Sequence, residues 1–168
     1  MTELTLPGWP LAVTALAIQL AIKIGHNYGW DYAFNAAPYL HILSYAPLLW
    51  FIYLNRNHRG MMLIGLGLLL NFVVIAANRG FMPVNLTGLA PHLQEQLSGG
   101  AGSPLHRALT DKTVFPFLAD QIRLSYGFNR IISIGDILLA LGIAFLIQHH
   151  MILGPGTTSS APNSHLPE

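Results

Sequence analysis

Four long apolar segments are the feature that most constrains this chain, because each approaches the roughly 20 residues that a helix needs to cross a bilayer. They cover residues 7–25, 37–54, 60–78 and 129–148. Only 9% of the residues are charged and 52% are hydrophobic, whereas soluble domains carry roughly 25% charged residues. None of the segments has a wholly polar face, which disfavours helices that lie on a membrane surface. The sequence therefore predicts an all-α integral membrane bundle of four transmembrane helices.

These segments predict a single domain over residues 1–150, followed by a tail over 151–168 that is poor in apolar residues and is expected to be disordered. Residues 79–128 form one long loop. Within it, Ser103-Pro104 pairs an N-cap residue with a proline suited to the first helical position, which predicts a short helix over about 104–110.

The short loop between the second and third segments carries Arg56 and Arg59. By the positive-inside rule this loop is cytoplasmic, which places both termini in the cytoplasm and the long loop outside. The sequence thus predicts a multi-pass membrane protein with both termini in the cytoplasm.

Composition also excludes several classes of function. A net charge of +1, with no basic run, argues against nucleic-acid binding. The absence of cysteine excludes disulfides, thiolate metal sites and cysteine nucleophiles. No GxSxG, P-loop or GxGxxG motif occurs. We therefore expect no cofactor, and as partners we expect the lipid bilayer together with either a partner membrane protein or further copies of this chain.

Each apolar segment carries one polar residue at a similar depth. Gln19, Ser44, Asn71 and Asp136 lie six or seven residues from the same end of the bundle, which corresponds to roughly 10 Å below one surface. This spacing predicts a polar layer inside the bundle. A carboxylate at such a depth costs a few kcal/mol unless it is paired or protonated. Asp136 is therefore either a proton or ligand site, or a packing residue satisfied by Asn71 and Ser133.

Two stripes of small and polar residues predict how the third and fourth helices meet. One stripe is Gly60, Ile64, Gly67, Asn71 and Asn78, and the other is Ser133, Asp136, Ala140 and Ala144. Small residues allow membrane helices to approach closely, and polar residues form hydrogen bonds between them. We therefore expect these stripes to face each other, with Asp136 near Asn71.

The stretch NRGFMPV, which follows the third helix, predicts a sharp turn over the mouth of the bundle. Gly80 can adopt the left-handed conformation that ends a helix, and Pro83 keeps Met82 extended. In one interpretation Met82 and Val84 cap a cavity that His106 and Asp120 approach from the loop. In the other, the stretch is only a rigid turn.

Histidines and aspartates on the outer side raise the alternative of a metal or haem site. The residues are His26, His41, His92 and His106, with Asp31, Asp111 and Asp120. Their spacing matches no recognised ligand pattern, so we predict no metal site.

The chain resembles a family of small bacterial multi-pass membrane proteins that has no assigned function. The similar positions are Asn78, Gly80, Met82, Pro83 and Val84, then His106, then Leu118 and Asp120, then Ser133, Gly135 and Asp136. The resemblance implies a bacterial cytoplasmic membrane as the location. The chain departs from the family pattern in two ways: family members begin with one more membrane helix ahead of the first segment, and LADQIRLSYGFN is unlike the proline-rich stretch expected there.

Three functions remain open at this point. The first is a non-catalytic binding or accessory membrane protein that uses the polar layer. The second is a transporter or proton-linked permease subunit that uses Asp136. The third is a membrane enzyme with His106 and Asp120 as acid–base groups.

Overall fold

The computed structural model describes residues 5–87, 89, 91–98, 103–124 and 130–152. Long helices dominate this part of the chain, and they are α1 (Trp9–Asn27), α2 (Asp31–Leu54), α3 (Met61–Ala77) and α5 (Ile134–Ile152). The predicted all-α class is confirmed. The predicted tail falls almost entirely on residues 153–168, which lie outside the described residues.

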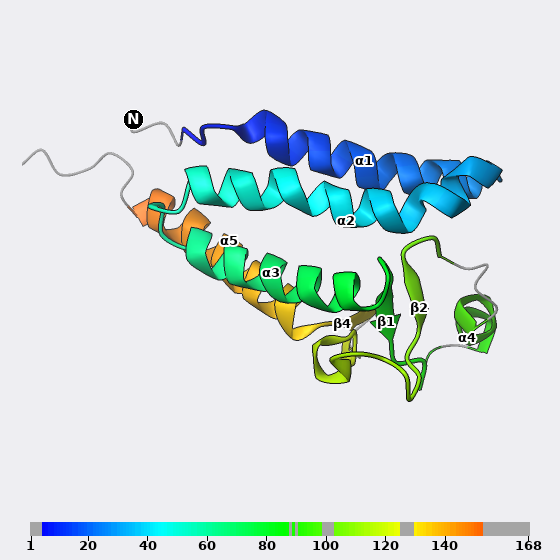
Figure 1. The fold of residues 1–168 in the computed structure, drawn as a ribbon. Coiled ribbons are helices and arrows are strands. Elements are labelled where there is room, and N and C mark those ends of the chain that lie inside the picture. The colour runs from blue at the N-terminus through cyan, green and yellow to red at the C-terminus, as the bar shows by residue number, and fades with distance from the viewer. Residues whose placement is uncertain (1–4, 88, 90, 99–102, 125–129, 153–168) are drawn as a thin grey trace, which may run out of the picture.

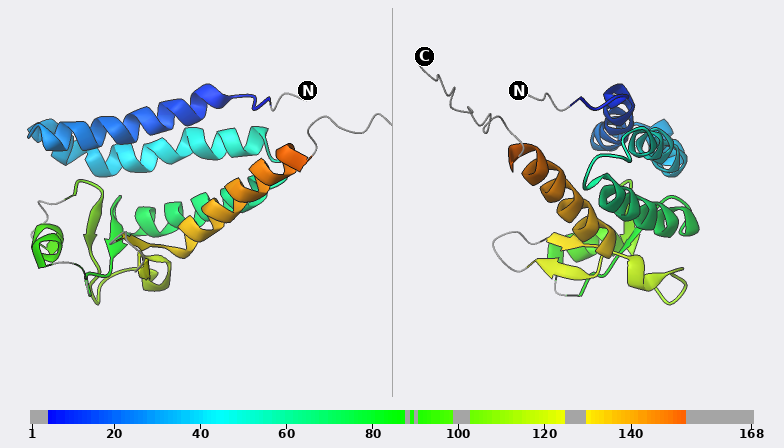
Figure 2. Two further views of the ribbon diagram at one scale, coloured as in Figure 1. Left: turned by 180° about the vertical axis from the view of Figure 1, so that it is seen from behind. Right: turned by 90° about the vertical axis from the view of Figure 1, so that its left-hand side faces the viewer.

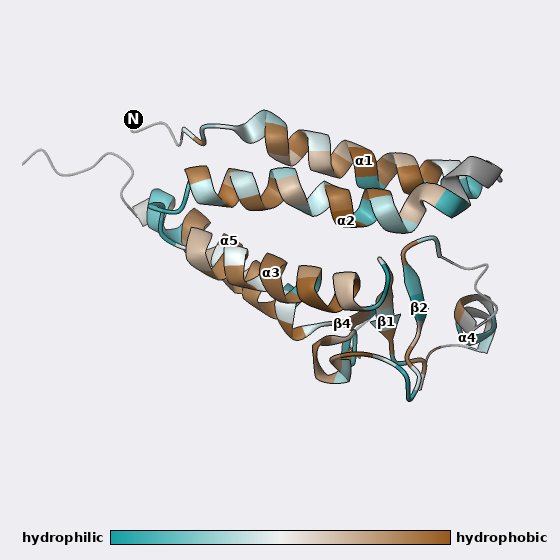
Figure 3. Cartoon of the chain, viewed as in Figure 1, coloured by the Kyte–Doolittle hydropathy of each residue, from teal (hydrophilic) through white to brown (hydrophobic). Residues whose placement is uncertain are grey.

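Within the described residues, three helices are long and apolar enough to cross a membrane. The candidate spans are Trp9–Asn27, Asn35–Leu54 and Ile134–Met151. Helix α3 is apolar but has only 17 residues, which is near the lower limit for a spanning helix. Most residues of the candidate spans are not buried within the chain, and hydrophobic residues run along the length of the long helices (Figure 3). These features are compatible with a membrane protein.

The long helices form two pairs. Helix α1 packs along α2, α3 packs along α5, and α2 packs against α3. The start of α1, the α2–α3 turn and the end of α5 lie at one end of the molecule, whereas the strands and α4 lie at the other (Figure 1). We call this second end the strand end.

The loop between α3 and α5 folds into a small layer of short elements. Strand β1 (Met82–Val84) pairs in parallel with β2 (His106–Ala108), and the short helix α4 (Pro91–Ser98) lies between them in sequence. A 3-10 helix, η1 (Pro116–Leu118), precedes β3 (Ile122–Leu124), which pairs antiparallel with β4 (Arg130–Ile132). Seen from behind, α5 lies in front of α3 and begins beside this layer (Figure 2).

The predicted helix over 104–110 is wrong, because residues 106–108 form β2 instead. Ser103 does cap locally, since its Oγ accepts a hydrogen bond from the backbone N–H of Leu105 over 3.3 Å. Pairing with β1 then determines the conformation that follows. A tertiary contact thus overrides the local signal for a helix start.

Two helix starts also differ from their predicted positions. Helix α2 begins at Asp31 rather than 37. Helix α5 begins at Ile134 rather than 129, because Arg130–Ile132 pair with β3. Asp136 therefore lies in the first turn of α5 and not two turns inside a helix.

Glycines bring α3 and α5 into backbone contact. A Cβ added at Gly142 would lie 2.7 Å from the backbone nitrogen of Ile64, and one added at Gly67 would meet the carbonyl oxygen of Gly135. The predicted stripe on α3 is therefore at the interface. The predicted stripe on α5 is wrong beyond its first turn, because Ala140 and Ala144 are exposed.

Candidate functional site

Hydrogen bonds hold Asp136 at the start of α5. The backbone N–H of Ser133 donates to Oδ2 of Asp136 over 2.9 Å. In return, the backbone N–H of Asp136 donates to Oγ of Ser133 over 3.0 Å. These reciprocal bonds form a capping box, which satisfies two N–H groups that a helix start leaves free. The Ser-x-Gly-Asp motif therefore has a local structural role as a helix cap.

Asn71 links this cap to α3. Its Nδ2 donates to Oδ1 of Asp136 over 2.9 Å, which confirms the predicted proximity of the two residues. The hydroxyl of Ser133 lies 2.9 Å from Oδ1 of Asn71 and 2.9 Å from Oδ2 of Asp136. Since Ser133 is fully buried and Asn71 nearly so, this network joins two helices in the interior of the molecule.

A second polar pair joins α1 to α2. Nε2 of Gln19 donates to Oγ of Ser44 over 3.0 Å. The Ser44 hydroxyl donates to the backbone carbonyl of His41 over 2.7 Å. Ser44 is buried completely, and its hydroxyl fixes the position of the Gln19 side-chain amide.

Side chains from both helix pairs enclose a polar cavity at the strand end. Its volume is about 190 Å³. It is lined by Gln19, His41, Tyr45, Asn71, Ile75, Met82, Leu105, His106, Asp120 and Asp136. Three of the four residues of the predicted layer therefore line one space. The fourth, Ser44, lies behind it.

The turn after α3 shapes one wall of this cavity. Gly80 has φ +89°, and a Cβ there would collide with Pro38 of α2, so a glycine is required. Its carbonyl oxygen accepts a hydrogen bond from Nδ1 of His41 over 2.8 Å. A carbonyl oxygen can only accept, so Nδ1 carries the hydrogen and Nε2 is the acceptor of the neutral ring. His41 thus presents an acceptor among residues that line the cavity.

The pairing of β1 with β2 determines which of their residues face the cavity. Met82 is opposite His106, and both line the cavity. Pro83 is opposite Arg107, and both line a separate hollow on the other side. This alternation follows from the two-residue period of a strand. Val84 is buried without lining the cavity.

Backbone hydrogen bonds place Asp120 beside β1. Its backbone N–H donates to the carbonyl of Pro83 over 3.0 Å, and its carbonyl accepts from the N–H of Asn85 over 2.9 Å. The side chain is only 7% exposed. Among the described residues its Oδ1 has no hydrogen-bond partner. Burial, and then the nearby charge of Asp136, raise the pKa of Asp120 from 3.8 to about 7.

His106 lies on the opposite strand from Met82 and is partly buried. Its Nδ1 lies 2.8 Å from Oγ of Ser103. Burial lowers the pKa of His106 below 6.5, and the nearby His41 and Lys23 lower it further while Asp136 opposes them. The lowered pKa of His106 favours the neutral ring.

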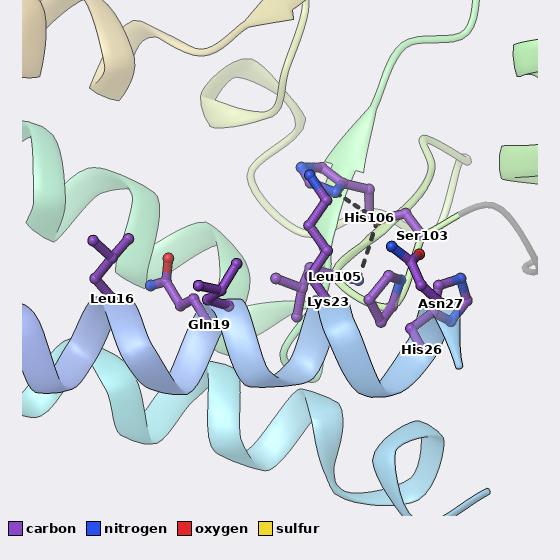
Figure 4. Close-up of a pocket in the computed structure, with 10 residues that line it drawn as sticks. Leu16, Gln19, Lys23, His26, Asn27, Ser103, Leu105 and His106 are labelled. Atoms are coloured by element: carbon purple, nitrogen blue, oxygen red, sulfur yellow. Dashed lines mark hydrogen bonds between the residues drawn. The ribbon is translucent and has the colours of Figure 1, made fainter. Parts of the chain in front are cut away.

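A larger groove adjoins the cavity along α1. It has a volume of about 430 Å³ and is lined by Leu16, Gln19, Leu20, Lys23, His26, Asn27, Ser103, Pro104, Leu105 and His106. Gln19, Leu105 and His106 belong to both spaces. Figure 4 shows Lys23 extending from α1 toward His106, above the leucines of the groove. An apolar groove and a polar cavity thus meet at shared side chains.

The remaining candidates lie elsewhere. Asn78 donates from Nδ2 to the carbonyl of Val114 over 2.8 Å and accepts from its N–H over 3.0 Å, so it ties α3 to the loop. Asp111 is exposed away from the cavity. The side chains of Asp31 and His92 lie outside the described residues. Among the residues that the structure describes, no group of three or more His, Asp or Glu side chains is placed to hold a metal ion.

Sequence reasoning did not assign Tyr45, Ile75 and Leu105 to the site. His41 and Tyr45 are four residues apart, so they share a helix face, and their ring centroids are 5.8 Å apart. That spacing could have indicated Tyr45 from the sequence alone. No pattern in the sequence indicates Leu105, because its position depends on the pairing of β2 with β1.

None of the curated proteins and none of the solved structures matches this chain. The model of one family does match, and it spans residues 3–148, which is most of the chain. That family is described as a family of unknown function, DUF5317. The chain belongs to the DUF5317 family.

Proposed function

We propose that this protein is an integral membrane protein that binds an amphipathic ligand without catalysing a reaction. The polar headgroup of the ligand occupies the polar cavity, and its apolar part lies in the groove along α1. The observation that carries this proposal is the junction of the two spaces at Gln19, Leu105 and His106. A polar cavity of about 190 Å³ beside a leucine-lined groove matches the two halves of such a molecule.

The cavity favours a headgroup that donates hydrogen bonds. Oδ1 of Asp120 is buried and has no hydrogen-bond partner within the described part of the chain, and a buried acceptor of this kind is costly unless something donates to it. Nε2 of His41 is a second acceptor, and the Asp136 carboxyl is a third. A protonated amine on the ligand, with its three N–H groups, could donate to all three.

Native mass spectrometry of the protein, extracted gently from its own host membrane, tests this proposal. We expect a small molecule to remain on the wild-type chain and to be lost from Asp120→Leu, which removes the unpartnered acceptor. Because the Asp120 carboxyl is buried at a cost, its replacement by leucine should leave the fold intact.

The matched control is Asp111→Leu, which changes an exposed aspartate of the same loop. It should retain the small molecule. A wild-type chain that carries no adduct, or an adduct that survives Asp120→Leu, contradicts the proposal.

A membrane enzyme is the second candidate, and one observation favours it. Asp120 and His106 line the same cavity, and the pKa of Asp120 is raised while that of His106 is lowered. Acid–base groups work best when their pKa lies near the working pH. An adduct whose mass changes with time in the wild type, but not in His106→Gln, would favour this candidate.

The proposed orientation places the α2–α3 turn, with Arg56 and Arg59, in the cytoplasm of a bacterial cell. The strand end then lies outside. The hypothesis of a transporter using Asp136 stays a prediction. The hydrogen bonds of Asp136 to Asn71 and Ser133 support a structural role for its carboxylate.

A further inference from the structure

We propose that Arg79 and Arg107 form a second binding site, for a phosphate-bearing group, on the face of β1 and β2 that points away from the polar cavity. Both arginines line a hollow of about 510 Å³, together with Asn35, Pro38, Tyr39, Ile42 and Phe81. The proposal is independent of the proposed function, because none of these residues lines the cavity or the α1 groove.

The backbone brings the two arginines together from distant parts of the chain. Arg79 follows the last residues of α3, where φ is +59° at Arg79 and +89° at Gly80. Arg107 is the middle residue of β2 and pairs with Pro83 of β1. Since neighbours of Arg107 along β2 face the other way, its guanidinium lies on the side opposite His106.

An aromatic ring holds Arg107 in place. Its guanidinium carbon lies 3.5 Å from the centroid of the Phe81 ring. A guanidinium stacked in this way keeps its edge N–H groups free for two parallel hydrogen bonds to a phosphate. The ring thus orients the arginine without using its donors.

Both arginine side chains are exposed, so their guanidinium groups are accessible to a ligand. Lys112 adds a third positive charge, because it lines an adjoining hollow of about 250 Å³ together with Arg107 and Phe81. Thr110 and Thr113 also line that hollow and offer hydroxyl groups. These three exposed cations favour an anion with several oxygens.

The surroundings place this anion at a membrane boundary. Asn35 begins a candidate membrane span, and the hollow lies at that end of α2. Below the arginines its wall consists of Pro38, Ile42 and Tyr39, and Tyr39 is 75% exposed. Cations at the end of an apolar helix face suit a phospholipid headgroup with its chains along the helix. A free phosphate would use the arginines alone.

Binding of short-chain lipids to the full chain in detergent, measured by native mass spectrometry, tests the site. The probes are dihexanoyl phosphatidylglycerol, dihexanoyl phosphatidylcholine and inorganic phosphate. We expect phosphatidylglycerol to bind, and the double variant Arg79→Gln, Arg107→Gln to weaken its binding at least tenfold. The matched control is Arg123→Gln, Arg130→Gln, which removes two exposed arginines from the same end of the molecule.

The outcomes separate the sources of the phosphate. If inorganic phosphate does not displace the bound phosphatidylglycerol, the site binds a lipid. Displacement by millimolar inorganic phosphate assigns it to a free phosphate. An equal loss of binding in the control pair, or no loss in the Arg79 and Arg107 pair, overturns the proposal. The single variant Arg79→Gln changes an exposed side chain and guards against an effect of misfolding.

Discussion

Asn71 and Asp136 are 65 residues apart in the chain, yet Nδ2 of Asn71 donates a hydrogen bond to Oδ1 of Asp136 over 2.9 Å. Gly135 makes this contact possible. A Cβ at position 135 would lie 2.6 Å from the side-chain Cγ of Asn71, so any larger residue would displace the amide. The glycine of the Ser-x-Gly-Asp motif therefore opens the space through which α3 reaches the cap of α5.

Gly135→Ala should lower stability. The added methyl group meets Asn71 and the carbonyl oxygen of Gly67, and such overpacking typically costs about 1–3 kcal/mol. This loss should exceed the roughly 1 kcal/mol that alanine gains over glycine in a helix. Thermal unfolding in detergent, followed by circular dichroism, measures the change. Ala140→Leu, on the exposed face of the same helix, serves as the control and should unfold near the wild-type temperature.

Asn71 and Asp136 should be coupled energetically. We expect a double-mutant cycle of Asn71→Ala and Asp136→Ala to give an interaction energy of about 0.5–3 kcal/mol, which is typical of residues in one hydrogen-bond network. Denaturant unfolding of the four proteins supplies the cycle. Additive effects of the two substitutions would mean that the hydrogen bond contributes nothing to stability.

The stability of the folded chain should depend on Asp120 between about pH 4 and 7. The pKa of Asp120 is 3.8 as a free group and about 7 in the fold, so the folded state holds this proton more tightly than the unfolded state. Stability from this group is therefore complete below pH 3.8 and is lost as the pH rises to about 7. Unfolding temperatures of the wild type and Asp120→Asn, measured across this range, should converge at low pH and diverge in favour of the variant at pH 7. Parallel curves would contradict the raised pKa.

Single-cysteine labelling should report the orientation, and the natural chain has no cysteine to remove. Thr110→Cys at the strand end and Asn57→Cys in the α2–α3 turn are both at exposed positions. In intact cells we expect a membrane-impermeant maleimide to label Thr110→Cys and to label Asn57→Cys only after permeabilisation. The reverse pattern would place the strand end in the cytoplasm.

Much of the site could be predicted because it depends on helix geometry. Counting residues along apolar segments brought Gln19, Asn71 and Asp136 to one level, and the structure places all three around one cavity. The predicted start of α5 was wrong. Asp136 and Asn71 still form a hydrogen bond, because the position of Asn71 on α3 was predicted correctly. The loop was less predictable, because three-residue strands are too short to show an alternating pattern.

The amino-acid sequence by itself determined the long apolar helices, the turn at Gly80 and the polar residues that the helices bring together. Each of these depends on local properties, namely hydrophobic length, the conformational freedom of glycine and the regular rise of a helix. Only the tertiary structure decided that residues 106–108 form a strand and that Arg79 and Arg107 share one hollow. It also decided that an oxygen of Asp120 is buried with no hydrogen-bond partner among the described residues. Those features require pairing and packing between segments that lie far apart in the chain, and no local pattern encodes such contacts.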